Sequence, residues 1–364
     1  MRKIRVLVVD DAVVVRRLVS EVLDADPELE VVGVAANGMV ALAKVAQLSP
    51  DIVTLDVEMP EMDGLTALRH LRRLKPKLPV VMFSTMTTRG ASATVEALTL
   101  GANDYVTKPD HAGNFTAAME HIRNELVPRI KALCARPDAS SLRTLAQAPV
   151  RSPHFGVPRL QPPVRIVAIG CSTGGPNVLS TLLPRLPADL AVPIVIVQHM
   201  PKLFTRLLAE RLDGLSTIDV AEGTLGAELR AGAAILAPGD FHMRVQRGPR
   251  PRLSLDQTEP RNSCRPAVDV LFESVVEVYG DGVLGVILTG MGQDGLRGAE
   301  LIREAGGDVI AQDQATSVVW GMPGFVVRRG LASEVLPPDG IADAIVRRVR
   351  MSAASERFSR GSAR

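Results

Sequence analysis

Three aspartates near the start of the chain are the first residues whose placement indicates chemistry. Asp10 and Asp11 follow the apolar run Ile4–Val9, and Asp56 follows a second apolar run that begins at Ile52. Apolar runs of this length are typical of buried parallel strands, and ligands of such sheets lie at the carboxyl ends of the strands. Carboxylate oxygens gathered there suit a hard cation such as Mg²⁺, and Asp56 becomes a candidate phosphoryl acceptor.

A hydroxyl group and an ammonium group are predicted at the same sheet edge. Ser84 follows the strand-like run Pro79–Phe83, and Lys108 follows Asp104–Thr107. The hydroxyl could hold a phosphoryl oxygen on Asp56, and the lysine would offset the remaining negative charge. Solvated surface acids or helix caps are the alternative for any single member, but they do not explain the whole set.

A second candidate site begins at a glycine-rich turn. The predicted strand Val164–Ile169 leads into Gly170-Cys171-Ser172-Thr173-Gly174-Gly175-Pro176 and then an apolar helix. Such a turn leaves backbone amides exposed at a helix N-terminus. It can present Ser172 as a nucleophile with an oxyanion hole, cradle a phosphate, or simply connect a strand to a helix. The turn has neither the dinucleotide glycine pattern nor the P-loop pattern, which weakens the second interpretation.

A nucleophilic serine needs a base and an acid that orients the base. His199 ends an apolar run and is therefore expected at a strand carboxyl end, whereas His242 lies in an expected loop. We favour His199 as the base, and a structural histidine bonded to the backbone is the alternative. Asp294 lies on another glycine-rich turn, directly after the predicted strand Val283–Leu288, and is the candidate acid.

The segments that carry Asp10, Asp11, Asp56, Ser84 and Lys108 alternate between strand-like and helix-like patterns. The pattern predicts a doubly wound, flavodoxin-like domain over residues 1–125, with five parallel strands and right-handed crossovers. A helical stretch from about 114 to 134 closes this unit. The predicted strands are Ile4–Val9, Glu30–Val34, Ile52–Leu55, Pro79–Phe83 and Asp104–Thr107.

The remaining chain divides into three segments. Residues 126–163 contain repeated prolines among serines and arginines, and we interpret them as an inter-domain linker. Residues 164–350 predict a second, mostly parallel α/β domain, in which the segment from 217 to 256 could form an antiparallel edge. Residues 351–364 are small, polar and basic, and we expect a disordered tail.

Composition limits the classes of function. The chain has 364 residues, 46% of them hydrophobic, and a formal net charge of +2, which gives no reason to propose nucleic acid as a partner. No apolar stretch is long enough to span a bilayer, so no membrane insertion is expected. The three cysteines are widely spaced and predict neither a disulfide framework nor a zinc site. We expect a cytoplasmic monomer.

Residues 1–125 resemble a response-regulator receiver domain. The matching motifs, in order, are Asp10-Asp11, Asp56-x-x-Met59-Pro60, Ser84, Tyr105 and Lys108-Pro109. The resemblance implies a set of Mg²⁺ ligands: Asp10, Asp11, Asp56 and the backbone carbonyl of Glu58. It also implies phosphoryl transfer from a histidine kinase to Asp56, with Ser84 and Tyr105 moving when the acceptor is charged.

The whole chain resembles the chemotaxis protein-glutamate methylesterase family. The motifs are Gly170–Pro176, Gln198-His199-Met200-Pro201, Arg265-Pro266, Met291-Gly292-x-Asp294-Gly295 and Gly321-Met322-Pro323. The resemblance implies hydrolysis of glutamate methyl esters on chemoreceptors, and deamidation of glutamine, by Ser172, His199 and Asp294. No metal is expected for this step. We expect backbone amides around Thr173 and Met291 to hold the oxyanion.

Two rival functions remain at this stage. A phosphorylation-switched binding module would use the Gly170–Pro176 turn to hold a nucleotide or another anion. A transcriptional response regulator would need a basic recognition helix, which the large α/β output region lacks. Labelling of Ser172 by a fluorophosphonate would favour the hydrolase.

Overall fold

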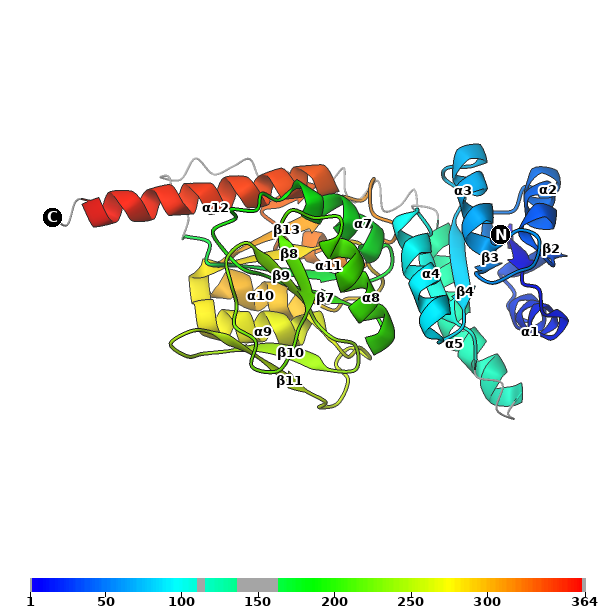
Figure 1. Cartoon of the computed structure of the whole chain (residues 1–364), viewed down its shortest axis with the longest axis horizontal. Coiled ribbons are helices and arrows are strands. Elements are labelled where there is room, and N and C mark those ends of the chain that lie inside the picture. Colours follow the sequence, from blue (N-terminus) through cyan, green and yellow to red (C-terminus); the bar gives the residue numbers. More distant parts are fainter. Residues whose placement is uncertain (1, 110–114, 136–162, 362–364) are drawn as a thin grey trace.

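The computed structural model of the chain describes residues 2–109, 115–135 and 163–361. Two α/β domains lie side by side, and Figure 1 shows the smaller N-terminal domain packed against one end of the larger one. The predicted fold class is confirmed for both domains. Among the described residues, no helix combines the length and apolar composition that crossing a bilayer requires.

The N-terminal domain is a five-stranded parallel sheet in the order β2-β1-β3-β4-β5. Every residue of β3 and β4 is buried, because helices cover both faces of the sheet. Its strands are β1 (Ile4–Val9), β2 (Leu29–Ala35), β3 (Ile52–Asp56), β4 (Val80–Ser84) and β5 (Asp104–Thr107). Its helices are α1 (Val13–Asp24), α2 (Gly38–Leu48), α3 (Gly64–Leu74), α4 (Thr88–Thr99) and α5 (Phe115–Cys134).

The C-terminal domain contains a seven-stranded parallel sheet in the order β14-β13-β12-β6-β7-β9-β8. Its strands are β6 (Ile166–Cys171), β7 (Ile194–Gln198), β8 (Asp219–Glu222), β9 (Ala233–Leu236), β12 (Val283–Ile287), β13 (Asp308–Gln312) and β14 (Glu334–Leu336). Its helices are α7 (Gly175–Leu182), α8 (Lys202–Asp213), α9 (Val268–Tyr279), α10 (Leu296–Glu304), α11 (Met322–Arg328) and α12 (Pro338–Gly361). The chain leaves β6 in one direction to β7 and later returns to its other side as β12, so a crevice is expected at the carboxyl ends of these three strands.

The segment from 217 to 256 differs from the expected antiparallel edge. β8 and β9 join the main sheet in parallel. The antiparallel pair is a separate hairpin of β10 (His242–Gln246) and β11 (Arg252–Asp256), which packs against α9. The short β-like runs indicated strands correctly, but they carried no information about which edge each strand would join.

Two further expectations are corrected. The helix expected from about 114 to 134 is present as α5, so the linker boundary at 126 is wrong: residues 126–134 form the last turns of α5, where Leu126 and Ile130 are buried in the core of the N-terminal domain. The rest of the expected linker lies almost entirely outside the described residues. The expected disordered tail continues α12 as far as Gly361, and Figure 1 shows this helix extending past the seven-stranded sheet. Extending a helix that is already nucleated costs little, and no glycine or proline interrupts this segment before Gly361.

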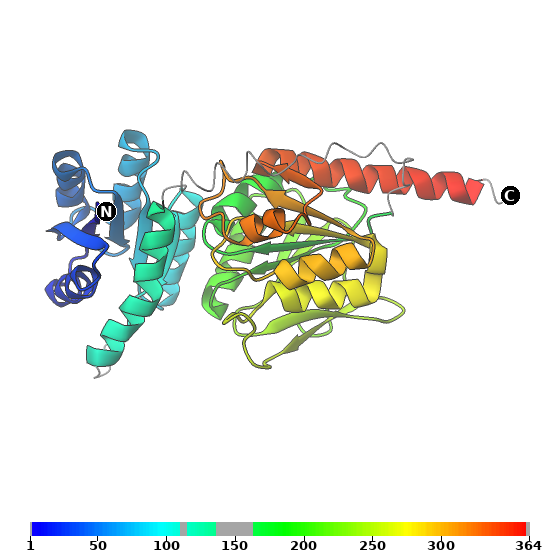
Figure 2. The same cartoon turned by 180° about the vertical axis from the view of Figure 1, so that it is seen from behind.

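The two domains meet along α4 and β5 on one side and α7 and α8 on the other, as both views show (Figures 1 and 2). The ring of Tyr105 on β5 stacks on Phe204 of α8 with ring centroids 4.6 Å apart. The hydroxyl of Thr173 donates a buried hydrogen bond of 2.6 Å to Asp104 Oδ2. Because Thr173 follows Ser172 directly, this contact lies beside the candidate nucleophile.

Candidate active site

Three neighbouring strands bring Ser172, His199 and Asp294 to one rim of the catalytic sheet. Cys171 and Gln198 are register partners at the ends of β6 and β7, so Ser172 and His199 follow at adjacent positions. The His199 backbone N–H extends this pairing by donating to Cys171 O at 3.2 Å. Asp294 lies in the loop after β12, on the other side of β6, and its side chain reaches across to His199.

The glycine-rich turn fixes the backbone of Ser172. Gly174 has φ +81°, and a Cβ there would lie 2.6 Å from the Val318 side chain. Ser172 N donates to Thr289 O, and Gln198 Nε2 donates to Ser172 O, each at 3.0 Å. The turn is therefore held by its neighbours on both sides, and the serine emerges at a defined point of the rim.

Asp294 is a buried carboxylate with many donors. Its Oδ2 lies 2.8 Å from His199 Nε2 and accepts the Val268 N–H at 2.6 Å. Its Oδ1 accepts the Asp269 N–H and the Asn262 side-chain amide, at 3.1 and 2.9 Å. Burial opposes ionisation, but the bond to His199 and the amides at the start of α9 outweigh it and lower the pKa of Asp294. The acid stays ionised and can orient the imidazole.

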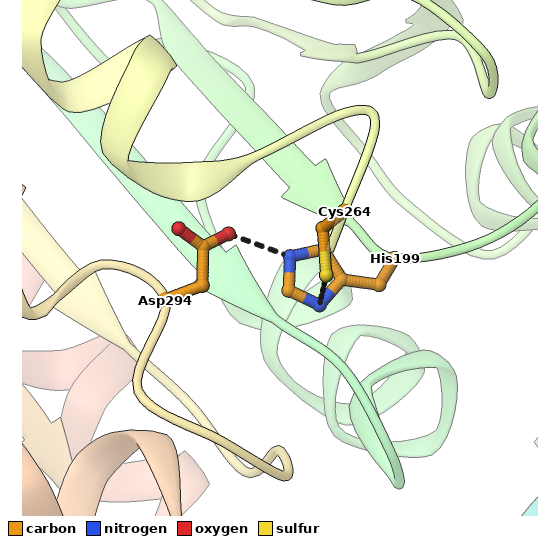
Figure 3. A group of neighbouring side chains, drawn as sticks. All are labelled: His199, Cys264 and Asp294. Atoms are coloured by element: carbon orange, nitrogen blue, oxygen red, sulfur yellow. Dashed lines mark hydrogen bonds and ion pairs between the residues drawn. The ribbon is translucent and has the colours of Figure 1, made fainter. Parts of the chain in front are cut away.

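The other ring nitrogen of His199 faces a thiol. Figure 3 shows His199 between Asp294 and Cys264, with Cys264 Sγ 3.6 Å from Nδ1. Burial alone would lower the pKa of His199, but the bonds to Asp294 and then to Cys264 raise it to about 10. Both contacts therefore favour the protonated form of the ring. Within the described part of the chain the Ser172 hydroxyl makes no hydrogen bond, so the structure joins the base to the acid but not yet to the serine.

Of the proposed oxyanion donors, Thr173 follows the serine directly in the sequence. Met291 follows Gly290, where an added Cβ would lie 2.8 Å from the Ser172 Cβ. Within the described residues, neither the Thr173 nor the Met291 backbone N–H has a hydrogen-bond partner, so both remain able to donate. Met291 is 39% exposed, whereas Thr173 is 7% exposed because Asp104 covers it. Access to this part of the rim therefore depends on the position of the receiver domain.

His242 and Cys171 lie in the core rather than at the rim. His242 belongs to β10, is 1% exposed, and its Nε2 lies 3.1 Å from Glu259 O. Cys171 is fully buried, its thiol donates to Val197 O at 3.5 Å, and burial raises its pKa. The surroundings of both residues indicate a structural role in the core.

Sequence reasoning did not find three residues that contact the site: Asn262, Cys264 and Asp104. Asn262 bridges the carboxylates of Asp294 and Asp269 through its side-chain amide, at 2.9 Å from each. Cys264 directly precedes the Arg265-Pro266 motif, and this position was the only feature of the sequence that could have pointed to it. Asp104 belongs to the other domain, and no local pattern connects it to Thr173.

The receiver residues form a separate acidic pocket. Lys108 Nζ lies 2.7 Å from Asp10 Oδ2 and 2.8 Å from Asp56 Oδ2. Burial, followed by the nearby charge of Asp10, raises the pKa of Asp56 to about 6, although Lys108 opposes this. Burial likewise raises the pKa of Asp10. Ionising Asp10 and Asp56 at the same time therefore costs free energy unless further positive charge is bound beside them.

This pocket fits a divalent cation. Apart from their ion pairs with Lys108, the buried oxygens Asp10 Oδ2 and Asp56 Oδ2 have no hydrogen-bond partner among the described residues. Together with Asp11 they offer ligand atoms within 4.8 Å of one another, and oxygen-only ligands suit Mg²⁺. The side chain of Glu58 points elsewhere, with Oε1 3.4 Å from Arg89 Nε, so only its backbone could join the set.

The two expected switch residues point away from the acidic pocket. The hydroxyl of Ser84 donates to Gly90 O at 3.1 Å and is fully buried. Tyr105 is buried against Phe204 in the domain interface. Ser84 therefore contacts helix α4, and Tyr105 contacts the C-terminal domain.

Comparisons with known proteins cover nearly the whole chain. Two family models match: response regulator receiver domain over residues 6–120 and CheB methylesterase over residues 167–345. A protein-glutamate methylesterase/protein-glutamine glutaminase from Trichodesmium erythraeum is 50% identical over 96% of this chain and 100% of that protein. Another, from Nocardioides sp., is 52% identical over 96% of each chain. The solved catalytic domain of Thermotoga maritima CheB methylesterase matches with a TM-score of 0.50 and 43% identity, covering 50% of this chain and 98% of that one.

Proposed function

This chain belongs to the protein-glutamate methylesterase/protein-glutamine glutaminase family, and from that membership and the site geometry we propose how it acts. It is a carboxylic ester hydrolase with a receiver domain. Its proposed substrates are methylated glutamates on chemoreceptor helices, whose demethylation gives sensory adaptation. The observation that supports the proposed triad best is the 2.8 Å contact between His199 Nε2 and Asp294 at the sheet rim beside Ser172.

In the proposed reaction Ser172 Oγ attacks the γ-carbonyl carbon of the methylated glutamate. His199 takes the serine proton through Nδ1, and the proton then leaves with the methoxy group as methanol. Asp294 keeps Nε2–H fixed and stabilises the cation. Water, activated by the same imidazole, hydrolyses the acyl-enzyme and restores Ser172. Glutamine would react in the same way and release ammonia.

This reaction requires a change at His199. Nδ1 faces Cys264 in the structure, and the contacts with Asp294 and Cys264 raise the pKa of the ring and favour its protonated form. The ring must lose its proton and approach the Ser172 hydroxyl before it can act as a base. The amides of Thr173 and Met291 are the proposed oxyanion donors, and two such donors are worth on the order of 10²–10³-fold each in kcat.

Regulation is proposed to begin at Asp56. Asp10, Asp11, Asp56 and the backbone carbonyl of Glu58 would hold Mg²⁺, which supplies positive charge for phosphoryl transfer from a histidine kinase. Lys108 then binds the phosphoryl group, and Ser84 and Tyr105 rearrange. Because Tyr105 packs on Phe204 and the neighbouring Asp104 binds Thr173, such a rearrangement would loosen the cover over the serine.

The test is methanol release from membranes that carry methylated chemoreceptors, with and without a small-molecule phosphodonor and Mg²⁺. We expect the phosphodonor to stimulate the wild-type protein and Ser172→Ala to lower kcat by about 10⁴–10⁶-fold. Ser180→Ala is the control, because that hydroxyl donates only to Asn177 O of its own helix.

The receiver is tested in the same assay. Asp56→Asn should retain basal turnover and lose the stimulation, since it cannot accept the phosphoryl group. A minor effect of Ser172→Ala would refute the nucleophile, and full stimulation of Asp56→Asn would refute the proposed switch.

A further inference from the structure

The thiol of Cys264 is a reactive group at the active site that the ester hydrolysis does not use. Cys264 is half-buried in the loop before α9, and its Sγ lies 3.6 Å from His199 Nδ1. Cys264, His199 and Asp294 offer ligand atoms within 4.8 Å of one another (Figure 3). Imidazole and thiolate are the ligands that borderline and soft cations select, unlike the oxygen-only receiver pocket.

The distance between the two atoms matches a tetrahedral metal site. With metal–sulfur and metal–nitrogen bonds of about 2.3 and 2.0–2.1 Å, a tetrahedral angle separates the two ligand atoms by about 3.5 Å. The observed separation is 3.6 Å. We propose that His199 Nδ1 and Cys264 Sγ form a binding site for a thiophilic divalent cation, for which Zn²⁺ is the best fit.

Asp294 already provides the outer support that such a site needs. A metal-binding histidine usually donates its other ring N–H to a carboxylate, which fixes the tautomer with the free nitrogen toward the metal. Asp294 Oδ2 at 2.8 Å from Nε2 has this relation to the ring. The amides of Val268 and Asp269 hold Asp294 in turn, so the ligand nitrogen is fixed before any cation arrives.

A cavity between the domains gives small ions access. Its volume is about 530 Å³, and His199 and Cys264 line it together with Tyr105 and Arg129 of the receiver. Lys202 and Arg265 line it as well. Arg129 pairs with Asp104 at 3.3 Å and Arg265 with Asp240 at 2.6 Å, so part of this positive charge is compensated. Water from this cavity can complete the coordination. An ion can thus reach the site while the receiver still blocks a protein substrate.

Occupancy would stop the esterase, and this consequence rests on the proposed function. The cation needs a thiolate and an unprotonated Nδ1, so its binding releases protons. Nδ1 would then be unable to accept the Ser172 proton. Zinc would act as an inhibitor by occupying the nitrogen that the proposed base needs, independently of phosphorylation of Asp56.

The binding test uses the full chain with Mg²⁺ present to fill the receiver pocket. Co²⁺ is the spectroscopic probe, because a cysteine thiolate bound to Co²⁺ gives a charge-transfer absorption band that oxygen ligands do not give. We expect one such site per chain, displaced by Zn²⁺ and lost in Cys264→Ser. Cys134→Ser is the matched control, since that half-buried cysteine lies in the receiver and should leave the band unchanged. A band that survives Cys264→Ser, or no band in the wild type, overturns the site.

The functional arm measures methanol release against free Zn²⁺. We expect inhibition that a chelator reverses, with at least a tenfold higher half-inhibitory concentration in Cys264→Ser and no change in Cys134→Ser. The absorption band does not depend on turnover, so failure of the esterase proposal and failure of the metal site are distinguishable. A cobalt–thiolate band without any inhibition would overturn the inhibitory role.

Discussion

His199 is the residue on which the proposed catalysis depends most directly. One ring nitrogen contacts a carboxylate that the α9 amides keep ionised, and the other contacts the Cys264 thiol. Both partners favour the protonated ring, which raises its pKa to about 10. In the proposed mechanism His199 must lose this proton before it can act as a base, so the raised pKa predicts a pH dependence of turnover.

The pH dependence of ester hydrolysis tests this state. A histidine with a raised pKa is charged below that pKa, so the base form grows as pH rises. We expect kcat/KM, corrected for spontaneous hydrolysis, to keep rising above the ordinary histidine pKa of about 6.5. Cys264→Ala removes one of the contacts that raise the pKa and should move the rising limb to lower pH. A profile that is flat above about 6.5 in both proteins would contradict the assigned state of His199.

At the residue scale, the rule that functional groups follow strand ends located Ser172, His199 and Asp294 from the sequence, and the structure places all three at one rim. The same rule could not find Cys264 or Asn262. These residues belong to an irregular loop, whose path depends on packing against distant segments. No hydrophobic periodicity therefore predicts their contacts with His199 and Asp294.

At the element scale, the order β12-β6-β7 creates the site. β6 is the central strand, and its turn needs a residue that tolerates a left-handed backbone at Gly174. Strand-length apolar runs made these elements predictable, and the alternation of strands and helices made the parallel sheet predictable. The pairing of β10 with β11 was not predictable, because which strands pair depends on packing against neighbours that the sequence of one strand does not specify.

Gly174→Ala tests how closely the turn is constrained. Its φ of +81° strains any side chain, and a Cβ would also lie 2.6 Å from Val318. We expect the free energy of unfolding to fall by about 1–3 kcal/mol and kcat to fall at least tenfold. Gly226→Ala is the matched control, with φ +78° and nothing within 4 Å of the added Cβ. Urea unfolding and methanol release measure both effects, and equal behaviour of the two variants would show that the Val318 contact does not matter.

At the scale of the whole molecule, the proposed role of the receiver is to cover the serine. The buried bond between Asp104 and Thr173 and the stacking of Tyr105 on Phe204 lie beside the serine and continue the hydrophobic core from one domain to the other. The sequence predicted the two domains but not their docking, because the contacting residues are far apart and each is unremarkable within its own element.

Asp104→Ala should weaken this cover. Loss of a buried hydrogen bond to a carboxylate costs on the order of 1–2 kcal/mol, which corresponds to roughly 5- to 30-fold in the closed–open equilibrium. We expect basal methanol release to rise by up to that factor and the stimulation by a phosphodonor to shrink. Lys131→Ala is the control, since Lys131 pairs with Asp26 and Glu28 on the opposite side of the receiver. Unchanged basal turnover in Asp104→Ala would argue against occlusion.

The most direct test of the central claim is to label the protein with a fluorophosphonate and map the adduct by peptide mass spectrometry. The account predicts a single adduct on Ser172, faster after phosphorylation, and strongly slowed by His199→Ala and Asp294→Asn. Since Cys264 and not Ser172 contacts His199 in the structure, the contrary result is specific. An adduct on Cys264, or Ser172 labelling that does not depend on His199, would contradict the account.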